Sequence, residues 1–364
     1  MKRITTIIIS IVGILFIGLV ACQRETAVAP TPTPEPVAEA RELNFYNWDT
    51  YIDPQIITDF EQQFGVTVNY QIFDSDSDMV DELMNGATAA YDLVVPSDYN
   101  VAVLRSENLL APLDRNNIPN FSNIDAQFLS PAFDPGNRFC VPYQWGTVGI
   151  GYNTEAIEAP VTSWADFFDP AYAGRIAVMD DARTMMGIAL LNLGFSPNST
   201  QPNEINQATG FLAEQADKVA FVHDDDGQDL LLNGDVDLVI EWSGDIFQLM
   251  EENDNINYVI PTEGAILWVD NMCIPIDAPN KELAEMLINY LLEPEVGAAL
   301  SNYIQYATPN EMALPLVDDI YRNNPAIYPT DQVRERLFLL VDVDNQTRDL
   351  YDGEWETLLT TFGQ

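Results

Sequence analysis

NFYNWDTYIDPQIITDFEQQFGVTVNYQIF, residues 44–73, predicts a strand, a helix and a second strand in direct succession. Both ends of this stretch are rich in aromatic and β-branched residues, which favour strands. Between them, Asp53 is suited to cap a helix, Pro54 to occupy its first position and Gly65 to end it. A strand–helix–strand unit of this length is typical of a parallel α/β sheet.

The same rhythm continues along the chain in two series. In the first, a helical stretch at 79–84 precedes a third strand at 92–95. In the second, strands are expected at 149–152, 175–178, 219–222 and 237–240, and a helix is expected at 281–292. The chain has 364 residues, which is more than one ordinary core holds, so two lobes are expected.

No linker rich in proline and glycine separates the two series, so the lobes should be joined by strands that cross between them. Residues 143–149 and 267–270 are the candidates for these crossings. Lobe 1 would comprise 41–146 plus about 270–314, and lobe 2 would comprise 147–269 plus about 315–364.

The N-terminus is typical of an export signal. Lys2 and Arg3 precede an apolar run that is too short for a comfortable membrane span. The run ends at Leu19-Val20-Ala21-Cys22, which resembles the lipoprotein box of bacteria. This predicts a signal peptide at 1–21, a lipid on Cys22, a proline- and threonine-rich tether at 22–40 and a location outside the cytoplasm. The alternative is an incidental cysteine in an ordinary signal peptide.

Two further cysteines, Cys140 and Cys273, lie in strand-like segments. An exported compartment permits a disulfide. A buried free thiol is the commoner state of such residues. The sequence leaves the two alternatives open.

The composition excludes several classes of protein. A hydrophobic fraction of 47% fits a globular chain and excludes a polytopic membrane protein or a wholly disordered one. Fifteen Lys+Arg against 57 Asp+Glu give a net charge of −42. Such a surface repels phosphate and attracts cations, so nucleic acid is not an expected partner. Adaptation to solubility or high salt is the alternative explanation of the acidity.

Aromatic and acidic residues recur together where the predicted strands end. Ligands of open parallel sheets bind at the carboxyl ends of the strands. Aromatic faces hold ammonium groups and methylene chains, and carboxylates accept their charge-assisted hydrogen bonds. The pattern therefore predicts a site for an organic polycation, although each residue alone also fits a core, rim or helix-cap position. The stretches that show the pattern are 47–51, 96–99, 179–183, 223–226, 242–245, 268–270 and 305–306.

Eight segments resemble the bacterial spermidine/putrescine-binding proteins, the extracytoplasmic receptors of polyamine ABC transporters. They are NFYNWDTYIDP, YDLVVPSDY, FCVPYQWGTVGIGYN, VTSWADFFDPAYAG, VMDDAR, LVIEWSGD, EGAILWVD and YATPN, in the same order, between about residues 41 and 330. The resemblance implies a two-lobed periplasmic-binding-protein fold, type II-like, with the ligand cleft between the lobes. It also implies a monomer that binds polyamine, has a membrane permease as partner, needs no cofactor and is not an enzyme.

The resemblance also assigns roles to individual residues. Asp270 matches an acid that engages an amine in both spermidine and putrescine receptors. Asp181 falls where spermidine receptors place an acid, and Asp245 where putrescine receptors place one. Asp224 falls where spermidine receptors have a serine that contacts the ligand. Asp49 falls where relatives have a small hydroxyl residue. Ser97 matches a polar contact, and the family's aromatic ligand contacts match Trp48, Tyr51, Tyr99, Trp242, Trp268 and Tyr306.

The chain departs from the family at two places. Thr184 replaces a glutamate that both kinds of receptor carry, and 339–341 is Leu-Leu-Val where relatives offer a glutamine or lysine. Asp49 or Asp224 is the candidate to replace the lost acid. The preferred polyamine stays open, and another cationic solute or a sugar is the alternative ligand.

Other signals are weaker. The acids at 74–78 have the spacing of a calcium loop but lack its later glycine and glutamate, so a helix-capping turn is favoured. His223 is the single histidine, so a His-rich zinc site or a Ser-His relay with a spare histidine is not expected. The pair Asp180-Asp181 admits an exported hydrolase, but a cationic ligand explains the aromatic residues better. We therefore expect no metal and no catalytic residue.

Overall fold

The computed structural model describes residues 41–73, 75–157, 159–224 and 226–363. The predicted signal peptide, the tether and Cys22 lie outside these ranges. Within them, no helix combines the length and the apolar character that crossing a membrane requires.

The first strand–helix–strand unit forms as its sequence predicts. Strands β1 (Arg41–Trp48) and β2 (Val66–Phe73) pair in parallel and enclose α1 (Pro54–Phe64). The Asp53 carboxylate accepts the Gln55 N–H at 2.8 Å, so it caps the helix. Gly65 adopts the left-handed conformation, with φ of 63°, and ends the helix there.

The strands of the described chain form one sheet in the order β2-β1-β3-β9-β4-β7-β5-β6, with β10 paired to β9 and β8 to β4. The remaining strands are β3 (Leu93–Val94), β4 (Cys140–Asn153), β5 (Ile176–Met179), β6 (Val219–His223), β7 (Leu238–Trp242), β8 (Ile256–Val259), β9 (Ala265–Cys273) and β10 (Leu337–Leu339). The pairs within the two predicted series, β1 with β2 and β3, and β5 with β6 and β7, are parallel. The centre of the sheet differs, because β4 and β9 run antiparallel to each other and to their neighbours β3 and β7.

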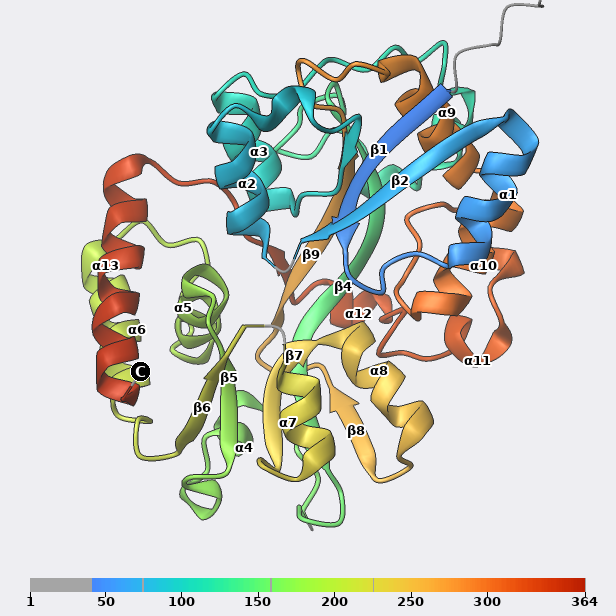
Figure 1. Ribbon diagram of the computed structural model, residues 1–364. Coiled ribbons are helices and arrows are strands. Elements are labelled where there is room, and N and C mark those ends of the chain that lie inside the picture. Colours follow the sequence, from blue (N-terminus) through green and yellow to red (C-terminus); the bar gives the residue numbers. More distant parts are fainter. Residues whose placement is uncertain (1–40, 74, 158, 225, 364) are drawn as a thin grey trace, which may run out of the picture. The chain divides into compact units, whose positions relative to one another are not determined.

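Strands β4 and β9 connect the two series (Figure 1). The first part of β4 pairs with β9, and its last part, from Val148 to Asn153, pairs with β7 and β8. The predicted crossings at 143–149 and 267–270 therefore lie inside these two strands. Contacts between Cα atoms do not separate the series into independent units, so the lobe boundaries stay a prediction.

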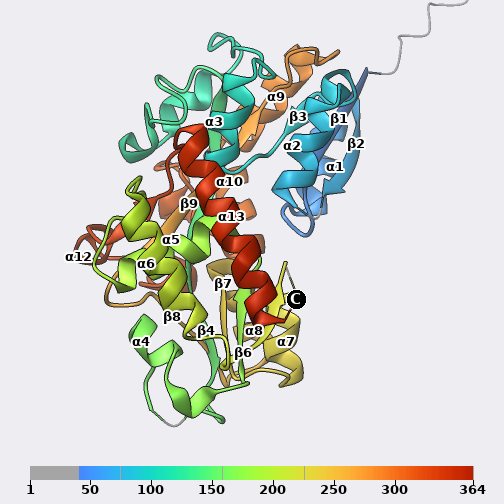
Figure 2. The same cartoon turned by 90° about the vertical axis from the view of Figure 1, so that its left-hand side faces the viewer.

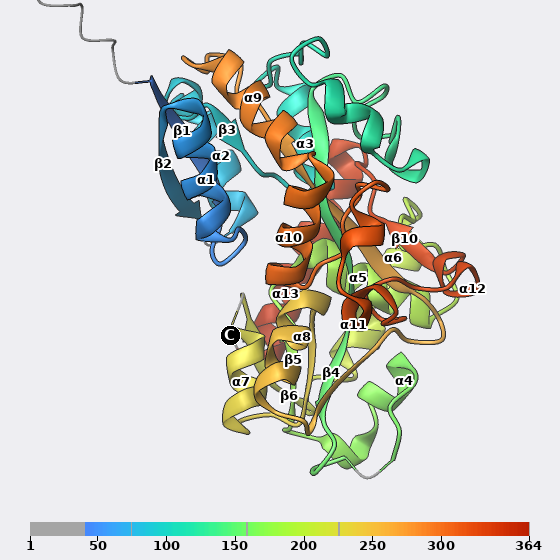
Figure 3. The ribbon, with the colours of Figure 1, turned by 90° about the vertical axis from the view of Figure 1, so that its right-hand side faces the viewer.

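Helices cover the sheet. The remaining α-helices are α2 (Asp76–Met84), α3 (Asp98–Ser106), α4 (Trp164–Phe167), α5 (Ala182–Asn192), α6 (Pro202–Ala213), α7 (Gly227–Asn233), α8 (Ser243–Glu252), α9 (Lys281–Leu291), α10 (Pro294–Ile304), α11 (Asp319–Arg322), α12 (Asp331–Arg334) and α13 (Asn345–Phe362). The short 3-10 helices are η1 (Ala87–Ala89), η2 (Pro119–Asn123), η3 (Ala126–Phe128), η4 (Pro170–Tyr172) and η5 (Leu314–Leu316). Helix α13 packs along α5 and α6 (Figure 2), and α9 leads directly into α10 (Figure 3).

A disulfide joins the two central strands. Cys140 of β4 and Cys273 of β9 are direct partners in the antiparallel pair, with their Cα atoms 4.5 Å apart. Both residues are fully buried. The structure thus selects the disulfide over the free thiols that the sequence left as the alternative.

Candidate functional site

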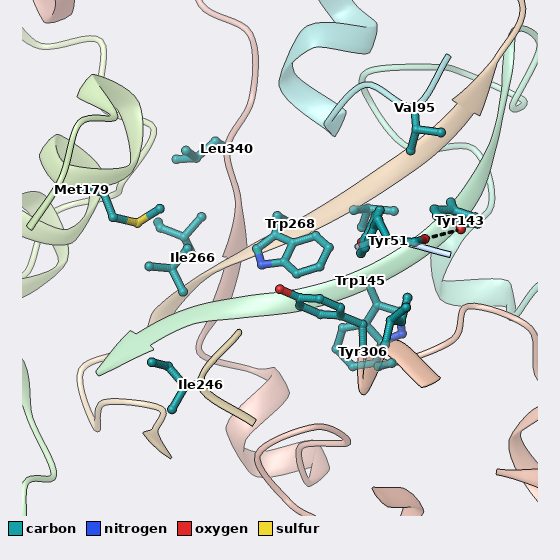
Figure 4. Packing of buried hydrophobic residues seen from close by; sticks show 14 of the residues in the cluster. Tyr51, Val95, Tyr143, Trp145, Met179, Ile246, Ile266, Trp268, Tyr306 and Leu340 are labelled. Carbon is teal, nitrogen blue, oxygen red and sulfur yellow. Dashed lines mark hydrogen bonds between the residues drawn. The ribbon is translucent and has the colours of Figure 1, made fainter. Parts of the chain in front are cut away.

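Four aromatic side chains from distant parts of the sequence form a continuous row. The ring centroids of Tyr51 and Tyr306 are 5.5 Å apart, those of Tyr306 and Trp268 are 5.0 Å apart, and those of Trp268 and Trp242 are 5.8 Å apart. All three contacts are edge-to-face, a favourable geometry for aromatic pairs. Figure 4 shows Tyr51, Trp268 and Tyr306 gathered over β4 and β9. The sequence predicted each member of this aromatic row.

Two glycines make room for the row. A Cβ atom at Gly146 of β4 would overlap the indole of Trp268, and one at Gly244 of α8 would overlap the ring of Tyr306. The rings therefore lie directly against the backbone of a strand and of a helix N-terminus. No larger residue fits at either place without moving a ring.

Two members of the aromatic row donate to aspartates. The Tyr51 hydroxyl donates to Asp270 Oδ2 at 2.7 Å, and the Tyr306 hydroxyl donates to Asp245 Oδ2 at 3.0 Å. A third tyrosine, Tyr143, fixes Tyr51 by donating to its backbone carbonyl at 2.7 Å. The arrangement places carboxylates next to aromatic faces, as recognition of an organic cation requires.

The sequence suggested that Asp270 lies at the end of a strand. In the structure it lies in the middle of β9. It faces Ser97 in an antiparallel bridge between β9 and the segment that follows β3. The Ser97 N–H donates to Asp76 Oδ2 at 3.2 Å, and the Val269 N–H donates to Asp98 Oδ2 at 3.1 Å. The backbone at Ser97 and at 269–270 thus connects Asp76, Asp98 and Asp270. We call these three aspartates the acid triad.

The sequence analysis assigned no site role to Asp76 or Asp98, although Asp98 lies in the strand-end stretch 96–99. Both belong to the first turns of helices, where aspartate is common for local reasons. The predicted capping turn is present, since the Ser75 hydroxyl accepts the Asp78 N–H at 3.1 Å. The turn also directs Asp76 toward Ser97, and this second role has no local signal.

Burial raises the pKa values of the acid triad. It raises that of Asp98 to about 8, to which the nearby carboxylates of Asp76 and Asp181 also contribute. Burial likewise raises the pKa of Asp270 well above its usual range, against the opposing effect of the Tyr51 hydroxyl. The pKa of Asp76 is raised by desolvation too. In the described part of the chain, no lysine or arginine forms an ion pair with any of the three.

Asp181 brings the second series of strands to the acid triad. It caps α5 by accepting the Thr184 N–H at 2.8 Å. Burial raises the pKa of Asp181, and its charge in turn raises the pKa values of Asp76 and Asp98. The structure thus places the predicted Asp181, Ser97 and Asp270 in one neighbourhood.

The other predicted residues lie apart from the acid triad or have other partners. Trp48 packs on Phe73 and donates from Nε1 to the Val95 carbonyl at 3.0 Å. Asp49 is exposed and accepts the N–H of the next residue. Asp224 is exposed as well and lines a separate cavity of about 300 Å³. Among the residues that the structure describes, we find no contact that joins either aspartate to the acid triad.

Tyr99 faces arginines. Burial raises the pKa of Tyr99, and Arg348 and Arg183 oppose the rise. Arg348 in turn contacts Asp342 at 2.6 Å. No ring contact between Tyr99 and the aromatic row occurs in the described ranges, so its role in ligand binding stays a prediction.

Comparison with known proteins identifies the family. The model of the bacterial extracellular solute-binding protein family matches residues 55–330. The spermidine/putrescine-binding periplasmic protein of Escherichia coli is 38% identical over 288 residues, 79% of this chain and 83% of its own. The chain is a bacterial extracellular solute-binding protein.

Further relatives of this solute-binding protein agree. The putrescine-binding periplasmic protein PotF of Escherichia coli is 35% identical and covers 83% of this chain and 87% of its own. The solved spermidine/putrescine ABC transporter substrate-binding protein PotD of Streptococcus pneumoniae has a TM-score of 0.81 and 33% identity, over 89% of this chain and 100% of its own. The solved Tp0655 lipoprotein of Treponema pallidum has a TM-score of 0.80 and 30% identity, over 87% of this chain and 99% of its own.

Family membership confirms two predictions. This solute-binding protein has the two-lobed α/β fold of periplasmic binding proteins. It belongs to a family of extracytoplasmic transport receptors and is not an enzyme. In the described residues, no group of three or more His, Cys, Asp or Glu side chains is arranged to hold a metal ion.

Proposed function

We propose that this solute-binding protein captures a polyamine, spermidine or putrescine, and delivers it to the membrane permease of an ABC transporter. The observation that carries the proposal is the aromatic row, in which Tyr51 and Tyr306 donate to the carboxylates of Asp270 and Asp245. Aromatic faces bind the methylene chain and its ammonium groups, and carboxylates bind the ammonium ends. The names of the relatives support the same ligand class.

Within this proposal, the aromatic row receives the carbon chain. Asp270 binds one ammonium group, Asp181 and Asp245 bind others, and Ser97 supplies a polar contact. The remaining candidates, Trp48, Asp49, Tyr99 and Asp224, belong to the walls of the cleft. The charge of −42 raises the local concentration of a cationic ligand, while adaptation to salt stays the alternative reason for it.

We also propose that the receptor is a monomer, tethered outside the cytoplasm by a lipid on Cys22. The leader sequence supports the tether, and the lipoprotein relative agrees with it. Metabolic labelling with palmitate is expected to mark the full-length protein. Labelling that persists in Cys22→Ala would contradict the assignment.

Calorimetry on protein lacking residues 1–40 tests the ligand. Spermidine, putrescine and spermine are titrated in turn, and micromolar or tighter binding of at least one is expected. If none binds in that range, the proposed function is wrong. Mass spectrometry of the bound polyamine after long incubation should find it chemically unchanged.

A ligand that contacts both lobes favours the closed arrangement of the receptor, because it binds that arrangement more tightly. Polyamine should therefore produce a saturable change in tryptophan fluorescence and a smaller radius of gyration in X-ray scattering. Trp242→Ala should weaken binding and leave the fold intact, because Trp242 is only partly buried. Unchanged scattering at saturating ligand would contradict closure.

A further inference from the structure

The acid triad is an unusual place for three carboxylates. Asp98 is 4% exposed and Asp270 is 8% exposed, whereas Asp76 is partly buried. The groups of the described chain that donate hydrogen bonds to them are neutral. Asp98 accepts from the Val269 and Tyr99 N–H groups, Asp270 from the Tyr51 hydroxyl, and Asp76 from Ser97 and Asn100. None of the three forms an ion pair there with lysine or arginine.

Neighbouring buried carboxylates cannot all be ionised without a cation, because each loses its hydration and repels the others. Two states avoid this penalty. In one, a proton neutralises part of the charge; in the other, a cation does.

A structural role explains the triad only in part. Asp98 lies in the first turn of α3 and holds that helix against β9 through Val269. An asparagine oxygen would accept the same N–H without bringing a charge. The need for a carboxylate is therefore not explained by the hydrogen bond.

A second observation points to a ligand independently of the acids. Trp268 lies two residues before Asp270, on the same face of β9, and is 7% exposed. Its Nε1–H has no acceptor among the described residues. Buried indole N–H groups usually find a partner, so this one is available to an acceptor that a bound solute would bring.

We propose that Asp76 and Asp98 act with Asp270 as the receptor for one ammonium group of the polyamine, and that the arrival of this group releases a proton. This inference rests on the proposed function. The O–H bond of one carboxylic acid breaks, its proton passes to the solvent buffer, and the ammonium group keeps its own protons. The triad thereby replaces the charge that is absent at Thr184, a role that the sequence had suggested for Asp49 or Asp224.

The charged and titratable groups around Asp98 agree with this exchange. Asp76 faces it from α2, Asp181 from the start of α5, and Asp270 from β9 with Tyr51 against it. Two cations act on the residues beside Asp98: Arg348 and Arg183 lower the pKa of Tyr99, and Arg183 also lowers that of Asp181. Burial raises the pKa of Asp98 to about 8 and that of Asp270 well above its usual range, which favours a proton on the triad at neutral pH when no ligand is bound.

Calorimetry in buffers of different ionisation heat tests the exchange. Spermidine and putrescine are titrated near neutral pH in phosphate and in Tris, which separates proton release from binding. The wild type should release up to about one proton per polyamine, and its affinity should rise with pH by up to about tenfold per pH unit below the pKa of Asp98.

Asp98→Asn keeps the acceptor for Val269 but removes the titrating group. This variant should release fewer protons and bind both polyamines about tenfold more weakly or worse. Asp76→Asn should change both quantities in the same direction. The matched control is Asp81→Asn on the exposed face of α2, which removes the same charge and should change neither.

The outcomes separate this inference from the proposed function. Wild-type protein that binds polyamine with no buffer dependence, together with unaltered affinity in Asp98→Asn, overturns the role of the triad and leaves the receptor function intact. Wild-type protein that binds no polyamine overturns the receptor function and the inference with it. The buffer dependence of the wild type needs no variant, so the test stands even if Asp98→Asn folds poorly.

Discussion

The two carboxylates that accept from the aromatic row lie in contrasting surroundings. Asp270 is in the middle of a central strand, almost fully buried, with Asp76 and Asp98 beside it. Asp245 is in the first turn of α8 and partly exposed, and the amides of a helix N-terminus favour its negative charge. The neighbouring carboxylates thus disfavour the negative charge of Asp270, whereas the helix N-terminus favours that of Asp245.

This difference teaches how the binding energy should be divided. A cation at Asp270 binds a carboxylate that is almost fully buried, so the contact is only weakly screened by water. A cation at Asp245 adds to a charge that the helix already stabilises. Asp270 should therefore govern affinity for every polyamine, whereas Asp181 and Asp245 should govern the choice between them.

We expect the biggest loss of affinity from Asp270→Asn. A desolvated ammonium group then lacks its carboxylate, which costs about 2–5 kcal/mol of binding free energy. Spermidine and putrescine should both weaken, as calorimetry can measure. Asp59→Asn, an exposed change of equal charge on α1, should bind like the wild type. A loss confined to one polyamine would show that Asp270 selects and does not anchor.

A smaller and opposite pair of effects is expected from Asp181→Asn and Asp245→Asn. A triamine presents one more charge than a diamine and can use one more acid. Asp181→Asn should weaken spermidine more than putrescine, and Asp245→Asn the reverse, by about tenfold in relative affinity. Equal losses for both ligands in both variants would contradict this division.

Gly244→Ala should act on the Asp245 side through geometry. The new Cβ overlaps the ring of Tyr306, so the ring must move and the bond from Tyr306 to Asp245 weakens. Several-fold weaker binding is expected, with an altered tryptophan fluorescence because Trp268 contacts the same ring. Gly210→Ala, on α6 with open space around the new Cβ, is the control. Wild-type affinity in Gly244→Ala would show that the position of Tyr306 does not matter.

The smallest effect concerns stability without ligand. The pKa of Asp98 is about 8 in the folded protein, whereas an unfolded aspartate titrates near 4. The stabilising contribution of its proton is complete below about pH 4 and is lost as the pH rises through about 8. The melting temperature of Asp98→Asn should therefore rise relative to that of the wild type as the pH rises. Each kcal/mol of difference in unfolding free energy corresponds to roughly 2–4 °C.

Thermal denaturation of both proteins between about pH 5 and pH 8.5 measures this difference. Saturating polyamine should reduce it, because the ligand neutralises the same charge. A difference that stays constant with pH would mean that Asp98 does not titrate in this range.

The sequence predicted the parts of this molecule whose signals are local. The strand-forming residues, the capping Asp53, Pro54 and Gly65 predicted β1, α1 and β2. Strand β2 has the bounds that were predicted for it. The aromatic row was found because its members recur beside acids. The roles of Asp76 and Asp98 were not found, because an aspartate in the first turn of a helix has the same local pattern whether or not it also contacts a neighbouring strand.

The missing information is the pairing of strands that are far apart in the chain. The bridge between Ser97 and Asp270 decides which carboxylates meet, and it depends on β9 entering the sheet antiparallel beside β3. For the same reason, the exposed positions of Asp49 and Asp224 had no signal in the sequence. The disulfide also needed this register, because Cys140 and Cys273 become partners only when β4 and β9 pair.

The bond between Cys140 and Cys273 also changes the covalent topology of the receptor. With a sequence separation of 133, it closes everything from β4 through β9 into one covalent ring. A protease that cuts once inside this ring produces no separate fragments, since both pieces stay joined through the two central strands. A single cut in a loop of the second series therefore releases no fragment as long as the disulfide is intact. Reduction of the disulfide removes this protection.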